Sequence, residues 1–318
     1  MQSKYLGAPS AAHAVVVGGG TMGADVAVVL LRAQCRTTLV EPRIEAHEVI
    51  RRQVQDNLDA LGLSANSQYL QIYSAVDQLQ WDGINLMIEC IPEVLSIKQQ
   101  LFQQLDALAP EHCLLASNSS SFPIGQIAQG CRTSSRMLGL HFFMPAHIVP
   151  LVEVVHGTFT DPVAADEAAV FMRRCGSVPI HVRKDVPGFI GNRLQHALGR
   201  EAFSLIQEGV VSAEDVDAAV RFGFGFRYLA AGPVLQKEHA GFDVHAAAAA
   251  TIYPSLSNIS EPPPVLADKP AQGKIGMKTG EGFYTWSPDK IATEKARYNK
   301  ALRGALEILA DDLPSIEP

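Results

Sequence analysis

Short apolar runs alternate with stretches of helical periodicity over the first half of the chain. This alternation is typical of a parallel sheet whose strands are connected by helices. Helices are expected over Val94–Leu108 and Asp161–Cys175, where apolar residues recur at helical spacing. The expected strands are Ala14–Val17, Thr37–Val40, Ile84–Cys90, Cys113–Ala116, Met137–Phe143, Leu151–Val155 and Val178–Val182.

The pattern changes after the last of these strands. Pro187 and Gly188 break it, and a long helical stretch follows over Phe189–Gln207. The rest of the chain is also expected to be helical, and 318 residues are enough for two domains. The sequence therefore predicts a doubly wound parallel α/β domain over residues 1–186 and an all-α domain over residues 187–318.

The composition is that of a globular protein, with 47% hydrophobic and 19% charged residues. A formal net charge of −7 argues against nucleic acid or an anionic membrane surface as the main partner. The first residues, MQSKYLGAPSAAH, contain no apolar stretch that resembles a signal peptide, and no apolar run approaches the roughly 18 residues of a membrane span. Five widely spaced cysteines form neither a metal-ligand pattern nor a disulfide framework. These features predict a soluble cytoplasmic protein without a metal, whose partner is a small molecule.

The segment AVVVGGGTMG carries the strongest local motif. Gly18, Gly20 and Gly23 match the G-x-G-x-x-G pattern between a strand and a helix, where backbone amides approach a pyrophosphate. Glu41 ends the second strand, 18 positions after Gly23, where a carboxylate accepts hydrogen bonds from the adenine-ribose hydroxyls. NAD is therefore the expected cofactor, although the nearby Arg43 is a residue type that can contact the 2′-phosphate of NADP.

Further segments follow this motif in a fixed order: LLASNSSSFPIGQIA, LGLHFFMPAHIVPLVEVV, DVPGFIGNR and GMKTGEGFYTW. Together the motifs resemble the L-3-hydroxyacyl-CoA dehydrogenase family, including its carnitine dehydrogenase, L-gulonate 3-dehydrogenase and lambda-crystallin branches. The resemblance runs from about Ala14 to Trp286. It implies a Rossmann-type domain followed by an all-α domain, as in 6-phosphogluconate dehydrogenase. It also implies a homodimer and the NAD-dependent oxidation of the 3-hydroxyl of an L-3-hydroxyacyl substrate, as in fatty acid metabolism.

His141 and Glu153 are the candidate acid–base residues. His141 ends an apolar strand on the carboxyl side of the expected sheet, and Glu153 follows 12 residues later on the next extended segment. Histidine changes charge near neutral pH and is therefore suited to remove the hydroxyl proton, and a bound carboxylate fixes its tautomer. The family resemblance gives this pair the same catalytic role. A buried structural histidine is the alternative for His141.

The resemblance also assigns residues that bind the substrate and the nicotinamide. Ser120 and Asn192 match the ligands of the substrate 3-oxygen. The alternative for Ser120 is a serine that forms a turn, and the alternative for Asn192 is a polar residue at the start of a helix. Glu93 and Lys98 match positions along the nicotinamide half of the cofactor, where a solvated helix start is the alternative. The remaining positions of the cofactor set are Thr21, Met22, Cys90, Asn118 and Met144.

Three departures from the family pattern concern the substrate. Met144 stands where the family usually has an asparagine beside the nicotinamide, with His147 nearby. Residues 42–83 contain no lysine, although members that use CoA carry a lysine-bearing segment there. The run GFGFRYLAAGP is similar to the carnitine and gulonate branches, which makes Arg227 a candidate anchor for a substrate carboxylate. A free 3-hydroxy acid therefore competes with a CoA thioester as the substrate, and an arginine at a helix end or dimer surface is the alternative for Arg227.

A protein of another class can also carry the glycine motif. Such a protein binds NAD(H) without turnover, as a sensor or a crystallin-like protein. The His141, Glu153 and Asn192 set argues against it, and Met144 is the feature in its favour. In either class the alanine-rich run Val244–Ile252 requires a partner face, either within the chain or across a homodimer interface.

Overall fold

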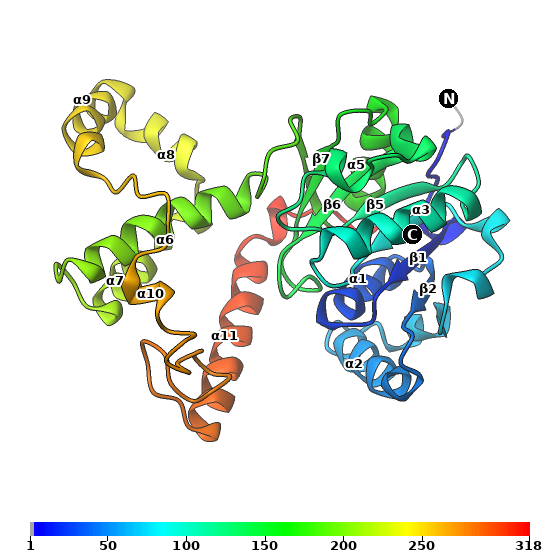
Figure 1. The fold of residues 1–318 in the computed structure, drawn as a ribbon, viewed down its shortest axis with the longest axis horizontal. Coiled ribbons are helices and arrows are strands. Elements are labelled where there is room, and N and C mark those ends of the chain that lie inside the picture. The colour runs from blue at the N-terminus through cyan, green and yellow to red at the C-terminus, as the bar shows by residue number, and fades with distance from the viewer. Residues whose placement is uncertain (1–2) are drawn as a thin grey trace. The chain divides into compact units, whose positions relative to one another are not determined.

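The computed structural model describes residues 3–318. Contacts divide the chain into two compact units (Figure 1). The first unit runs from the N-terminus to Asn192 and also includes residues 312–318, and the second comprises residues 193–311. The tail joins the first unit because Ile316 forms a bridge with Cys175 and the Glu317 amide donates to the Arg174 carbonyl.

The first unit is an α/β domain built on one sheet with the strand order β3-β2-β1-β4-β5-β6-β7-β8. Neighbouring strands are parallel except for β6 and β7, which are antiparallel. The strands are β1 (His13–Val17), β2 (Arg36–Val40), β3 (Leu70–Tyr73), β4 (Leu86–Glu89), β5 (Leu114–Ser117), β6 (Met137–Phe142), β7 (Leu151–His156) and β8 (Val178–Val182). The helices are α1 (Thr21–Arg32), α2 (His47–Asp59), α3 (Leu95–Leu108), α4 (Ile124–Ile127) and α5 (Pro162–Arg174).

Helices cover both faces of this sheet. On one face α1, α2 and α5 pack against alternate strand residues such as Ala14 and Val16. On the other face α3 and α4 pack against the residues between them, such as Val15 and Met87. The central strands are apolar on both sides because both sides are buried. The strand order reverses between β1 and β4, which places a crevice for ligands at their carboxyl ends.

The fold predicted from the sequence is confirmed, with differences in detail. Every expected strand is present, with bounds that shift by up to two residues. The sequence analysis missed β3, a four-residue edge strand in which Gln71 and Tyr73 are exposed. The sheet is mostly parallel, as predicted, and the antiparallel pairing of β7 with β6 was not foreseen. Strand direction leaves no trace in the apolar pattern, because both orientations bury the same residues.

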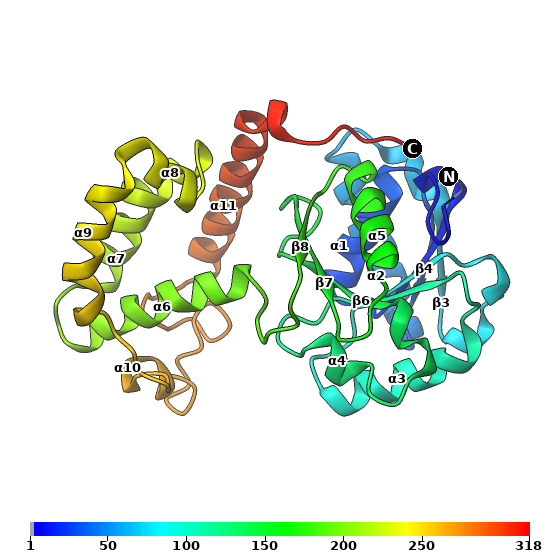
Figure 2. The ribbon, with the colours of Figure 1, turned by 90° about the horizontal axis from the view of Figure 1, so that it is seen from above.

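The second unit is entirely helical apart from isolated bridges (Figure 2). Its helices are α6 (Gly191–Gln207), whose first turn belongs to the first unit, α7 (Ala213–Ala219), α8 (Pro233–Ala240), α9 (Phe242–Ile252), α10 (Pro264–Ala267) and α11 (Pro288–Ile308). The described helices α6–α11 contain no buried side chain. Large apolar groups stand exposed there, including Phe222 and Tyr253 at 73% and 71%.

The contacts place the division between the units later than the sequence boundary at residue 186. Ile190, Gly191 and Asn192 all hydrogen-bond to residues of the α/β domain, and therefore the first turn of α6 belongs to that domain. No described helix combines the length and the apolar character needed to cross a bilayer.

Candidate active site

The turn after β1 has the geometry of a nucleotide cradle. Gly18 has a φ of +108°, and a Cβ there would lie 2.6 Å from the Cys90 carbonyl oxygen. A Cβ on Gly23 would lie 1.8 Å from the Gly18 oxygen, and therefore only glycine allows α1 to start this close to the turn. At Gly20, by contrast, a Cβ would meet nothing within 4 Å, which leaves the backbone open to a ligand at the α1 N-terminus. These features fit a bound pyrophosphate.

Glu41 follows β2 and lies beside this turn. Its Oε2 accepts a hydrogen bond from the Gly19 amide at 3.0 Å, and its Oε1 accepts from Arg43 Nε at 2.7 Å. The Arg43 hydrogen bond, which outweighs burial, lowers the pKa of Glu41 below its ordinary value. The carboxylate is therefore ionised and available to ribose hydroxyls, while Arg43 is held by Glu41. This arrangement favours NAD over NADP.

His141 and Glu153 are direct partners in the antiparallel register of β6 and β7. Both side chains are buried, and His141 Nδ1 lies 2.7 Å from Glu153 Oε2. Phe143 and Phe189 flank the imidazole, with ring centroids 4.7 and 5.5 Å away. Within residues 3–318 no hydrogen-bond partner occupies His141 Nε2, which leaves this atom available to a ligand.

The second oxygen of Glu153 is held by the linker that follows β8. Positive φ angles at Gly188 and Phe189 turn this chain, and the amides of Ile190 and Gly191 then donate to Glu153 Oε1 at 2.9 and 2.8 Å. Burial alone would raise the pKa of Glu153. The hydrogen bonds from His141, Gly191 and Ile190 outweigh it, and the pKa is lowered. An ionised Glu153 only accepts, and therefore Nδ1 carries a proton; in the neutral tautomer the electron pair is then on Nε2.

Glu93 organises the serine turn that follows β5. Its Oε1 accepts hydrogen bonds from the hydroxyls of Ser119 and Ser121 and from the amides of Ser120 and Ser121. Burial opposes ionisation, but these bonds and the charge of Lys98 lower the pKa of Glu93 to about 2. The Ser120 carbonyl in turn accepts from Asn192 Nδ2 at 3.1 Å, which brings the two expected ligands of the substrate oxygen together.

Lys98, which the resemblance places along the cofactor, lies next to Glu93. Its side chain is only 1% exposed, and its ammonium lies 2.7 Å from Glu89 Oε1 and 3.1 Å from Glu93 Oε2. Lys98 is therefore buried beneath the serine turn, where it fixes Glu93, and it does not present its charge at the surface. Glu89, which the sequence analysis missed, is fully buried and also accepts from the Ser117 hydroxyl and the Ile91 amide. Its only signal in the sequence is an acid within the apolar run LMIEC.

Asn118 and Cys90 lie at the ends of β5 and β4. Asn118 Oδ1 accepts the Phe142 amide at 2.9 Å and thereby ties the end of β6 to the end of β5. Burial, the main cause, raises the pKa of the Cys90 thiol, and the thiol is therefore neutral. Thr21 and Met22 open α1, with Thr21 exposed and Met22 half-buried against the core.

The loop after β6 contains Met144, whose side chain is 64% exposed. The sequence analysis missed the residue that holds this loop, Asp25 of α1, which is 2% exposed. Asp25 Oδ2 accepts the Ala146 amide at 3.0 Å, and Oδ1 lies 3.0 Å from His147 Nδ1. The loop beside the acid–base pair is thus attached to the helix that follows the glycine turn.

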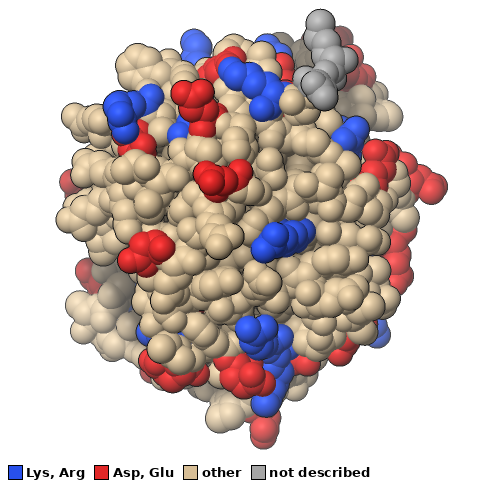
Figure 3. Space-filling view, turned by 90° about the vertical axis from the view of Figure 1, so that its right-hand side faces the viewer, with Lys and Arg blue, Asp and Glu red and all other residues tan. Residues whose placement is uncertain are grey.

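Arg227 belongs to the second unit, in a short helical turn over Gly225–Leu229, and its side chain is exposed. Among the described residues no cluster of His, Cys, Asp and Glu has the arrangement of a metal site. On the face shown in Figure 3, Lys and Arg are interspersed with Asp and Glu and form no continuous basic surface.

A doubly wound domain with a glycine turn, an acid after β2 and a buried imidazole–carboxylate pair defines an NAD-dependent dehydrogenase that acts on CH–OH groups. Two family profiles match the chain: the NAD binding domain of 3-hydroxyacyl-CoA dehydrogenase over residues 13–186, and its C-terminal domain over residues 188–286. The chain therefore belongs to the 3-hydroxyacyl-CoA dehydrogenase family.

The relatives differ in substrate. The chain is 32% identical over 300 residues to 5-formyl-3-hydroxy-2-methylpyridine 4-carboxylate 5-dehydrogenase of Mesorhizobium japonicum. This match covers 92% of this chain and 97% of the relative. It is 32% identical over 290 residues to the human mitochondrial hydroxyacyl-coenzyme A dehydrogenase, with 86% and 91% covered. It is 34% identical over 230 residues to L-carnitine dehydrogenase of Streptomyces griseus, with 71% and 68% covered.

The solved structures that are similar to this chain also belong to enzymes with different substrates. The crystal structure of a 5-formyl-3-hydroxy-2-methylpyridine 4-carboxylic acid 5-dehydrogenase, described as an NAD⁺-dependent dismutase, superposes with a TM-score of 0.87 at 30% identity. That match covers 93% of this chain and 98% of the other. A (S)-3-hydroxybutyryl-CoA dehydrogenase from Ralstonia eutropha superposes with a TM-score of 0.71 at 26% identity, covering 86% and 99%.

Proposed function

We propose that this chain oxidises a CH–OH group of a small free carboxylic acid with NAD⁺, using His141 as the general base and Glu153 as its orienting partner. The observation that carries the proposal is the buried 2.7 Å contact between His141 Nδ1 and Glu153 Oε2. This contact leaves Nε2 with a free electron pair at the carboxyl edge of the sheet.

His141 Nε2 removes the proton of the substrate hydroxyl as the hydride leaves the carbinol carbon. The nicotinamide, when bound, supplies the hydride acceptor. Glu153 stays ionised and stabilises the imidazolium that forms. Ser120 and Asn192 hold the oxygen as it becomes a carbonyl, because neutral donors stabilise developing negative charge without competing for the proton. Glu93 and Lys98 keep the serine turn in place for this purpose.

The same steps apply to an aldehyde in its hydrated form, whose carbon also carries a hydrogen and a hydroxyl. Loss of a proton to His141 and of hydride from that carbon gives a carboxylic acid. This chemistry fits the substrate named for the Mesorhizobium relative, which is a formyl-substituted pyridine carboxylate. One acid–base pair is therefore compatible with alcohol and aldehyde substrates alike.

Two features support a free acid over a CoA thioester. Residues 42–83 contain no lysine, although the 3′-phosphate and pyrophosphate of CoA call for basic donors. The exposed Arg227 has no partner within the described chain and has the fork geometry that suits a substrate carboxylate. A CoA thioester is the competing substrate class, since 3-hydroxyacyl-CoA dehydrogenases are among the relatives.

The proposal is tested by following NADH absorbance with four substrates in parallel: L-3-hydroxybutyryl-CoA, L-carnitine, L-gulonate and 5-formyl-3-hydroxy-2-methylpyridine 4-carboxylate. We expect turnover with a free acid, loss of turnover in His141→Gln, and a raised KM in Arg227→Met. Preference for the thioester would overturn the substrate assignment. Unchanged turnover in His141→Gln would overturn the mechanism. Tight NADH binding without any turnover would favour a binding protein.

We also propose that the second unit pairs with its counterpart in a homodimer. Its helices expose apolar side chains too large and too numerous for a free surface, among them Phe222, Phe226, Val234 and Tyr253. Light scattering coupled to gel filtration should give twice the 34.3 kDa of the chain, and a monomer at micromolar concentration would refute the pairing.

A further inference from the structure

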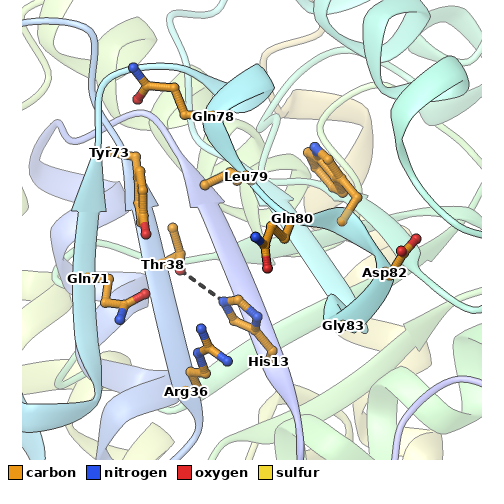
Figure 4. A pocket seen from close by; sticks show the side chains of 11 residues that line it. His13, Arg36, Thr38, Gln71, Tyr73, Gln78, Leu79, Gln80, Asp82 and Gly83 are labelled. Atoms are coloured by element: carbon orange, nitrogen blue, oxygen red, sulfur yellow. Dashed lines mark hydrogen bonds between the residues drawn. The ribbon is translucent and has the colours of Figure 1, made fainter.

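A polar groove of about 510 Å³ lies on the α3 and α4 side of the sheet, at the end occupied by β1, β2 and β3 (Figure 4). His13 and Arg36 open β1 and β2, so this end of the groove lies at the amino ends of the strands. Gly18 and Glu41, which form the nucleotide cradle, follow the carboxyl ends of the same strands. The His13 and Arg36 end of the groove is therefore separated from the nucleotide cradle by the length of β1 and β2. The other end reaches Tyr73, which ends β3 and whose carbonyl accepts the Glu41 amide.

The groove exists because the connection between β3 and β4 contains only short helical turns. Val76 and Trp81 from this connection are buried against Val17 and Val40, and they close the apolar part of the face. The polar part of this face, which lines the groove, lies outside that apolar cluster. There the strand register aligns Thr38 with Gln71, and the side chains of His13 and Arg36 project from neighbouring strand positions. Arg36 and Gln71 are exposed at this place, His13 is half-buried and Thr38 is buried.

The floor of the groove is preorganised. Thr38 is 1% exposed, and its hydroxyl lies 2.9 Å from His13 Nε2. Burial, followed by the charge of Arg36, lowers the pKa of His13 to about 4, and the imidazole is therefore neutral at pH 7. His13 contributes a neutral hydrogen-bonding group, and Arg36 contributes the positive charge.

The groups above the floor complement a hydroxylated anion. No ion pair or hydrogen bond within the described chain engages the exposed guanidinium of Arg36. Figure 4 shows Gln71 and Tyr73 on the same face as Arg36, around one space, with Gln80 across from them. Asp82, the carboxylate of the groove lining, lies on the side of the groove opposite Gln71. The volume lies within the range of about 300–1,000 Å³ found for small-molecule sites.

We propose that this groove is a second, non-catalytic ligand site for a small hydroxylated carboxylate. The Arg36 guanidinium binds the carboxylate through paired hydrogen bonds, and the Gln71 and Gln80 amides together with the Tyr73 hydroxyl bind the ligand hydroxyls. The ligand does not displace NADH, because its carboxylate is held at the amino ends of β1 and β2 and the nucleotide cradle follows their carboxyl ends.

The test is calorimetric titration of D-gluconate into the full chain saturated with NADH, which also prevents turnover. We expect one saturable site in addition to bound NADH. Arg36→Met should weaken gluconate binding about tenfold or more, because a charge-assisted hydrogen bond is lost. Gln71→Glu, at an exposed position, should weaken it through repulsion. Arg51→Met removes an exposed arginine of α2 outside the groove and serves as the matched control.

Several outcomes would overturn this assignment. Gluconate that binds Arg36→Met and Gln71→Glu as tightly as the unaltered chain would occupy another site, such as the active site. Sorbitol, an uncharged polyol, binding as tightly as gluconate would remove the role of the guanidinium. Failure of gluconate to bind the NADH-saturated chain, or displacement of NADH by gluconate, would likewise refute it. Unchanged NADH affinity in both groove variants supports the independence of the two sites and excludes misfolding as the cause of a loss.

Discussion

Glu153→Gln is the most informative change in the acid–base pair, because it removes a charge while keeping shape. Glu153 Oε1 accepts two backbone amides and Oε2 accepts His141 Nδ1. A glutamine that keeps its oxygen on the two amides turns its NH₂ toward His141. The opposite orientation leaves two amide donors facing an NH₂, at about 1–3 kcal/mol for each unpaired group. The first orientation therefore prevails, and the imidazole proton moves to Nε2, where it blocks proton removal.

The size of the effect follows from the charge that forms during the reaction. An imidazolium about 4 Å from a carboxylate is stabilised by about 4 kcal/mol at an effective dielectric constant near 20. Losing this stabilisation should lower kcat about 10³-fold. The unfavourable tautomer should lower kcat further. Steady-state kinetics would measure this, with NADH affinity and Tm as controls for folding. The double variant with His141→Gln should be no slower than His141→Gln alone, since the two residues act as a unit. A Glu153→Gln enzyme within threefold of the original kcat would refute the reasoning.

Other predictions concern the scaffold of the site. Lys98→Met should cost about 3–5 kcal/mol in urea unfolding, because Glu89 is then a buried charge without its partner. Adding Glu89→Gln should recover part of the loss, and no recovery would contradict this pairing. Glu93 has a pKa of about 2 in the fold against an ordinary 4.5, so its stabilisation is present above about pH 4.5 and is lost as the pH falls toward 2. The unfolding free energies of the original chain and Glu93→Gln should therefore converge with acid, and a constant difference would exclude the effect. Gly23→Ala should weaken NADH binding at least tenfold in a fluorescence titration, because its Cβ would lie 1.8 Å from the Gly18 oxygen; unchanged affinity would show that the turn can relax.

Local sequence patterns predicted the elements whose signals are local. The glycine turn and the acid after β2 follow from spacing, and seven of the strands follow from apolar runs bounded by turn residues. The four-residue strand β3 escaped because an edge strand with exposed Gln71 and Tyr73 has no continuous apolar run. The contact between His141 and Glu153 was expected from family resemblance, and the antiparallel register that creates it has no sequence signal.

The buried charges could not be predicted because their partners are distant in the sequence. Lys98 stands in the first turn of α3, where a charged residue usually indicates a solvated helix start. Its burial depends on Glu89 at the end of β4, which in turn binds Ser117 at the end of β5. Asp25 similarly meets the Ala146 amide 121 residues later. Only the folded sheet brings such groups together, and a single sequence does not show which distant residues come into contact.

The antiparallel pairing of β6 with β7 separates the acid–base pair from the loop between them. Register holds Glu153 opposite His141, and a slip of one residue would turn the carboxylate to the other face. The loop between the two strands takes no part in this register, although Phe143 packs beside the imidazole and Asp25 holds the Ala146 amide. The exposed Met144 can therefore change without shifting the alignment of the acid–base pair. Such a division gives a lineage of enzymes a route to new substrates through one position, and it gives the protein engineer a residue to randomise first.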